Sequence, residues 1–148
     1  MTDNGTTLRD RVLDRDDDLR DTVELLLDRA NQRQMWLMFI DERGCLGDPL
    51  MPMNDYPDDP DQRTEVADLG EVSQAELLMQ RAGLILEATG NASIVLAWER
   101  RGASAIGADD RAWARAMAAA SGALGIPLRA QFVVHNHGVR QLHPDDYL

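Results

Sequence analysis

The chain of 148 residues contains no lysine, a single cysteine, and no apolar run long enough to span a membrane. With Cys45 alone, internal disulfides, zinc ribbons and Cys-x-x-Cys redox pairs are excluded. Cys45 lies beside a predicted turn without an obvious cationic activator, so we do not expect it to be catalytic. The N-terminal segment MTDNGTTLRD is polar and lacks the basic and apolar parts of a secretory signal. We therefore expect a cytoplasmic protein that makes no membrane contact.

Positive charge is scarce as well. The chain has 15 arginines and 26 acidic residues, which gives a formal net charge of -11. Direct binding to nucleic acid is not expected, because neutralisation of phosphates supplies most of that affinity. The exclusive use of arginine is typical of a GC-rich bacterial genome. A content of 44% hydrophobic and 28% charged residues indicates one globular domain with its own core.

Helical and strand patterns alternate over residues 8–148, and the polar residues 1–7 are expected to be a disordered start. The expected elements, in chain order, are one or two helices over 8–30 interrupted by Asp16, Asp17 and Asp18, strands over 34–41 and 45–53, a helix over 73–90, a strand over 92–98, a helix from 109 to 122 or 125, and strands over 127–135 and 139–142. Prolines in the second strand favour an edge position. Residues 54–63, rich in proline and aspartate, are expected to form a mobile acidic loop. Ser73 and Glu76 have the spacing of a capping box at the start of the second predicted helix region.

The order α-β-β-α-β-α-β-β predicts an α/β fold, a single-domain sandwich in which a mixed sheet is flanked by helices on both faces. In such sheets, ligands bind where a central strand ends and the next helix begins. Here this segment runs from Trp98 to Asp110. We therefore expect a cleft at this place.

Four segments follow one another in a distinctive succession. RQMWLMFIDERG forms an early strand and turn, ASIVLA an apolar strand, ADDRAWARAMAAASGALGIPL a helix with its exit, and FVV the next strand. Over residues 31 to 142, this succession resembles the JAB/MPN domain of RadC-type proteins. The resemblance implies an MPN/JAB-like fold. In that family, zinc is held by a His-x-His motif and an aspartate, and one position is left for an activated water.

The chain departs from that family at the metal motif. The His-x-His positions fall on Trp98 and Arg100, which cannot bind a metal ion. The family's serine falls on Gly107, and its metal aspartate falls on Asp110. No equivalent of its general-base glutamate stands in the acidic loop. The resemblance therefore implies a pseudoenzyme without catalytic residues or cofactor, a scaffolding module that binds a protein partner or forms a homo-oligomer.

Charged side chains border the expected cleft, namely Glu99, Arg100, Arg101, Asp109 and Asp110. We favour a salt bridge from Arg100 to Asp110 that fills the space left by the zinc. The alternative is a small-ligand, nucleotide-binding or enzymatic site that uses Glu99, Arg100, Asp110 and Arg140. In it, the guanidinium of Arg100 or Arg101 and the helix N-terminus bind an anion or a partner's carboxylate.

Three histidines near the C-terminus allow a further alternative. In the HNH sequence His135 and His137 flank Asn136, and a hairpin turn that tolerates positive φ explains Asn-His-Gly, so we expect exposed turn histidines. A metal-dependent hydrolase remains the alternative, with zinc held by His135, His137 and His143 together with Asp145 or Asp146.

Three more side chains are given structural roles. Arg140 is expected to anchor the terminal HPDDYL through Asp145 or Asp146, at the border of the cleft. Trp36 and Trp113 are expected to be core residues.

Overall fold

The computed structural model describes residues 10–148, so the start at residues 1–7 lies outside the described residues. Its helices are α1 (Asp16–Leu27), α2 (Gln74–Thr89), α3 (Ala108–Leu124) and α4 (Pro144–Tyr147). Its strands are β1 (Gln34–Ile40), β2 (Leu46–Met53), β3 (Arg63–Val66), β4 (Gly70–Ser73), β5 (Ser93–Glu99), β6 (Leu128–His135) and β7 (Gly138–Leu142). No helix within residues 10–148 is long and apolar enough to cross a membrane.

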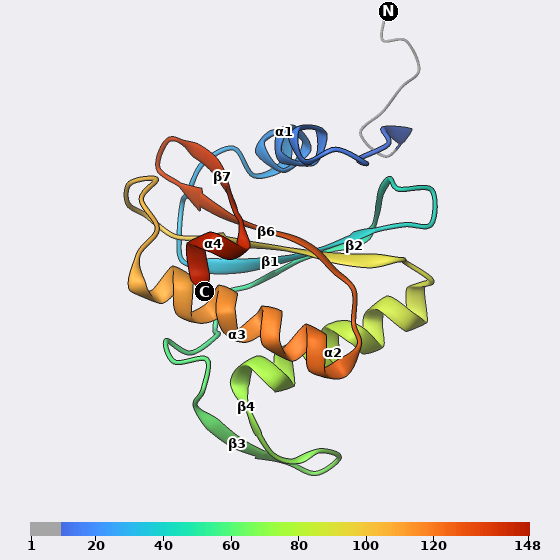
Figure 1. Cartoon of the computed structure of the whole chain (residues 1–148), viewed down its shortest axis with the longest axis vertical. Coiled ribbons are helices and arrows are strands. Elements are labelled where there is room, and N and C mark those ends of the chain that lie inside the picture. The colour runs from blue at the N-terminus through green and yellow to red at the C-terminus, as the bar shows by residue number, and fades with distance from the viewer. Residues whose placement is uncertain (1–9) are drawn as a thin grey trace, which may run out of the picture.

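Five strands form one mixed sheet in the order β2-β1-β5-β6-β7. Only the β5–β6 pair is parallel, and the other pairs are antiparallel. Helix α1 covers one face of this sheet, and α2 and α3 cover the other (Figure 1). The predicted α/β class, the mixed sheet and the helices on both faces are therefore confirmed. Strand β2, which contains two prolines, lies at an edge as predicted.

The central strand β5 is apolar from Ile94 to Trp98 because both of its faces are buried there. Ile94, Leu96 and Trp98 face the core beneath α2 and α3. Val95 and Ala97 face the core beneath α1. This alternation decides which face receives each side chain at the end of the strand.

Helix α1 is shorter than predicted. The expected interruption at Asp16, Asp17 and Asp18 is wrong, because these residues form the first turn of α1, where carboxylates stabilise the positive end of the helix dipole. The chain before them is bound to the β1–β2 turn instead, since the amide of Leu13 donates to the carbonyl of Gly44 at 2.7 Å.

Helix α2 begins as its sequence predicts. The hydroxyl of Ser73 accepts the amide of Glu76 at 3.1 Å, and the carboxylate of Glu76 accepts the amide of Ser73 at 2.8 Å. The helix ends at Gly90, whose φ of 71° lies in the left-handed region that favours glycine.

The β3–β4 hairpin and the short helix α4 extend the predicted order of elements. The loop predicted over 54–63 ends at Gln62, because Arg63 begins β3. The hairpin was missed because its strands have four residues each and half-exposed, partly charged sequences. It projects beyond α2, away from the five-stranded sheet (Figure 1).

Candidate functional site

A cleft of about 500 Å³ opens where β5 ends and α3 begins, the place predicted from the strand-to-helix succession. The 100–107 loop and the start of α3 form one side of it, and Tyr56 from the acidic loop forms part of the other. The cleft is lined by Arg33, Tyr56, Trp98, Arg100, Arg101, Gly102, Ala103, Ala105, Gly107, Ala108, Asp109, Asp110 and Trp113.

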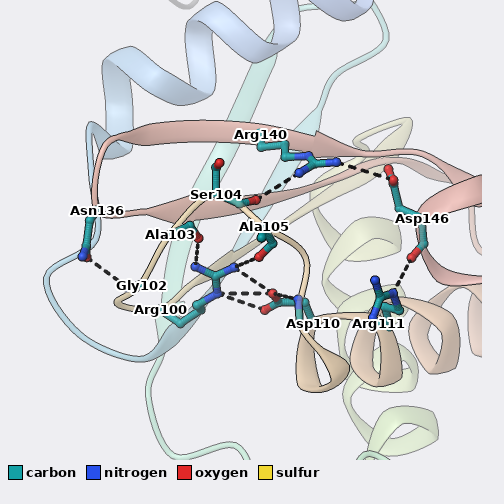
Figure 2. A network of polar contacts seen from close by, with 11 residues as sticks. Arg100, Gly102, Ala103, Ser104, Ala105, Asp110, Arg111, Asn136, Arg140 and Asp146 are labelled. Carbon is teal, nitrogen blue, oxygen red and sulfur yellow. Dashed lines mark hydrogen bonds and ion pairs between the residues drawn. The ribbon is translucent and has the colours of Figure 1, made fainter.

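The predicted salt bridge between Arg100 and Asp110 is confirmed (Figure 2). Nη2 of Arg100 lies 2.8 Å from Oδ2 of Asp110, and Nε donates to both carboxylate oxygens at 3.2 Å. The terminal nitrogens of Arg100 also donate to the carbonyls of Ala103 at 2.5 Å and Ala105 at 2.8 Å. Asp110 accepts in addition the amide of Gly107 at 2.9 Å. All three nitrogens of Arg100 are therefore in use inside the protein.

The 100–107 loop is also held from the β6–β7 hairpin (Figure 2). Gly102 and Asn136 exchange two hydrogen bonds, of 3.0 and 3.1 Å. Arg140 donates to the carbonyl of Ser104 at 3.2 Å and forms an ion pair with Asp146 at 3.7 Å. The predicted anchoring of the C-terminal tail by Arg140 is thus confirmed, and the same side chain binds the tail and the loop.

Glu99 does not belong to the cleft, which corrects the sequence-based assignment. It is 3% exposed and lies on the α1 side of the sheet. Its carboxylate accepts four hydrogen bonds: from the amides of Asn31 at 2.7 Å and Gln32 at 3.1 Å, and from the side chains of Gln34 at 2.9 Å and Trp36 at 2.8 Å. Burial alone would raise the pKa of Glu99, but these donors outweigh it and lower the pKa below its usual value.

Two charged side chains of the cleft are left without an opposite charge. Arg101 uses Nε to donate to the carbonyl of Asn31 at 2.9 Å, and its two terminal nitrogens have no partner within residues 10–148. Asp109 has no hydrogen bond or ion pair in the same part of the chain. Both side chains are exposed and line the cleft.

Tyr56 is a site residue that sequence reasoning missed. Its ring packs edge-on against Trp98 and Trp113, with centroid distances of 5.6 and 5.3 Å. Arg33 lies 3.7 Å over the Tyr56 ring and donates to the backbone carbonyls of Tyr56 at 2.7 Å and Pro57 at 3.0 Å. The only signal in the sequence was one large aromatic residue within a run of prolines and aspartates.

The two other tryptophans were assigned to the core. Trp113 is 2% exposed, as predicted. Trp36 is only partly buried and packs against the core beneath α1.

Two of the three histidines lie side by side: the amide of His137 donates to Nδ1 of His135 at 3.2 Å, and the two ring centroids are 6.5 Å apart. His135, at the end of β6, is only 7% exposed, so the prediction of an exposed turn histidine is wrong for this residue. His137 is exposed, as predicted. Burial, followed by the charge of Arg100, lowers the pKa of His135. His143 lies before α4, where its amide donates to Asp146 at 2.8 Å. Within residues 10–148 no group of three His, Cys, Asp or Glu side chains could hold a metal ion.

The turn between these histidines differs from the expectation in one detail. Gly138 alone carries a positive φ, of 146°, and Asn136 and His137 do not. Asn136 is explained instead by its side-chain bond to Gly102.

No protein-family model matches the chain, and no curated protein matches it in sequence. The relationship to JAB/MPN domains is therefore a hypothesis. It depends on the succession of elements and on the positions of Trp98, Arg100 and Asp110.

Proposed function

We propose that this chain is a non-catalytic domain of the JAB/MPN type that acts as a protein-interaction or scaffolding module. The ion pair between Arg100 and Asp110 carries the proposal. It occupies the place, between the end of a central strand and the start of the next helix, where that family binds zinc. A guanidinium held 2.8 Å from the remaining metal-type carboxylate neutralises that carboxylate and repels a divalent cation.

The 100–107 loop supports the interaction part of the proposal. Asp110, Asn136 and Arg140 hold this loop, while Arg101, Ala103 and Ser104 within it stay exposed. A surface that is already fixed before binding loses little conformational entropy when a partner docks. The partner is another protein or a second copy of this chain.

Photo-crosslinking tests the proposal. Amine-reactive crosslinkers are unsuitable because the chain has no lysine. A benzophenone-bearing amino acid is therefore placed at Ser104, and a control is placed at Leu25, which is 66% exposed on α1 at the opposite face of the sheet. Illumination in the native host is expected to give a discrete protein adduct from position 104 and none from position 25. Equal labelling from both positions, or none from position 104, contradicts the proposal.

A further inference from the structure

The polar groups that line the cleft divide into two sets. Most are already bonded inside the protein, including the nitrogens of Trp98, Trp113, Arg33 and Arg100 and the carboxylate of Asp110. Three side-chain groups have no partner within residues 10–148: the terminal nitrogens of Arg101, the carboxylate of Asp109 and the hydroxyl of Tyr56.

The Tyr56 hydroxyl is the most informative of the three. Tyr56 is 8% exposed as a whole residue, but its hydroxyl is open to solvent, because Thr22 Oγ1 is the only buried side-chain polar atom without a partner within residues 10–148. Burial is the main cause that raises the pKa of Tyr56; the charge of Arg33 opposes this rise and nearby aspartates add to it, so the phenol keeps its proton at neutral pH. A solvent-accessible hydroxyl that makes no hydrogen bond within residues 10–148 therefore lines the cleft together with the start of α3.

The two unpaired charges have opposite sign, which restricts the ligand. A simple anion would be attracted by Arg101 but repelled by Asp109. A simple cation would be attracted by Asp109 but repelled by Arg101 and Arg33. A ligand that carries both an anionic and a cationic group satisfies both side chains at once.

We infer that the cleft binds a free α-amino acid, with its carboxylate on Arg101, its ammonium group on Asp109, and a hydrogen bond to the Tyr56 hydroxyl. A volume of about 500 Å³ is within the range of small-molecule sites. Arg100 and Asp110 take no part as ligands, because they are bonded to each other. This site goes beyond the proposed interaction function and does not depend on the JAB/MPN hypothesis.

Isothermal titration of the untagged chain with each of the twenty common amino acids tests the inference. At least one is expected to bind, and its N-acetyl and carboxamide derivatives, which each lack one charge, should bind at least about tenfold more weakly. Such derivatives also separate a free amino acid from a residue inside a partner's polypeptide, in which both groups are blocked. Absence of binding by every amino acid at millimolar concentration, or equal binding of the blocked derivatives, overturns the inference.

Matched variants locate the site. Arg101→Gln, Asp109→Asn and Tyr56→Phe are each expected to weaken binding by about fivefold or more, because each removes one contact. The control variants are Arg81→Gln, which acts on an ion pair between α2 and Asp68, and Asp21→Asn on α1. Both controls should bind as the wild type does. If the controls and the cleft variants lose affinity alike, or none does, the ligand binds elsewhere and the assignment fails.

Discussion

Glu99 and Arg100 are neighbours in the chain, yet their side chains lie on opposite faces of the sheet. Glu99 accepts four hydrogen bonds on the α1 side, and Arg100 pairs with Asp110 on the α3 side. One carboxylate fixes the chain between α1 and β1, while the neighbouring guanidinium fixes the loop between β5 and α3. Two neighbouring residues at the end of β5 therefore stabilise segments on both faces of the sheet.

Replacing Glu99 tests its structural role. Glu99→Gln keeps the shape but turns one acceptor into a donor, which then faces donors already in place. Unfolding in urea should show a loss of about 1 to 3 kcal/mol. Glu42→Gln, at an exposed position in the β1–β2 turn, is the control and should stay within about 0.5 kcal/mol of the wild type. A loss for Glu99→Gln no larger than that of the control would contradict this role.

The lowered pKa of Glu99 predicts that the stability of the fold depends on pH. Because the folded-state pKa of Glu99 lies below its ordinary value of 4.5, its stabilisation is present above that value. It is lost as the pH falls through the lower folded-state pKa. Other carboxylates with lowered pKa, including Asp41 and Asp68, contribute in the same direction.

Comparing two chains isolates the Glu99 contribution. The melting temperature of the wild type is expected to fall more steeply between neutral and strongly acidic pH than that of Glu99→Gln. The two curves should converge at the acidic end. Parallel curves over the whole range would show that Glu99 does not titrate with folding.

A double-mutant cycle tests the Arg100–Asp110 pair. The two side chains are 21% and 8% exposed, so removing either partner leaves a largely buried charge unpaired. Arg100→Ala and Asp110→Ala should each destabilise the fold by about 1 to 3 kcal/mol, and the double variant by clearly less than their sum. Additive losses would mean that the pair does not act as a unit.

Tyr56 is expected to anchor the acidic loop. Tyr56→Ala removes the ring that packs on Trp98 and Trp113 and under Arg33, at a cost of about 2 to 4 kcal/mol. Amide hydrogen exchange of residues 54–62 should accelerate more than that of β5. Tyr56→Phe keeps the packing and is expected to leave exchange of the loop unchanged. Equal acceleration in β5 and the loop would point to global destabilisation instead.

The sequence predicts the three central strands β1, β5 and β6 well because they are largely buried on both faces, which explains their apolar runs. It also predicts the cleft and the Arg100–Asp110 contact, since a strand end and the start of the next helix are neighbours in any such fold. The β3–β4 hairpin has no comparable signal, because its short strands bury little apolar surface.

Two errors at the site have physical causes. The strand was predicted to end at Trp98, and extending it by one residue gives Glu99 the opposite face by simple alternation. Tyr56 could not be found, because its contact with Trp98 depends on how a loop without regular structure folds back across the sheet. Local patterns carry no information about such a path.

The most direct test of the central claim is to restore the metal ligands. Zinc is measured by elemental analysis in untagged wild-type protein, in Trp98→His/Arg100→His, and in the matched Trp98→Ala/Arg100→Ala, each checked for folding by circular dichroism. With Asp110 as the third ligand, the histidine variant is expected to bind about one zinc per chain, and the other two none. A folded histidine variant without zinc, or a wild type that carries about one metal ion per chain, would contradict the assignment of Arg100 and Asp110 to a lost metal site.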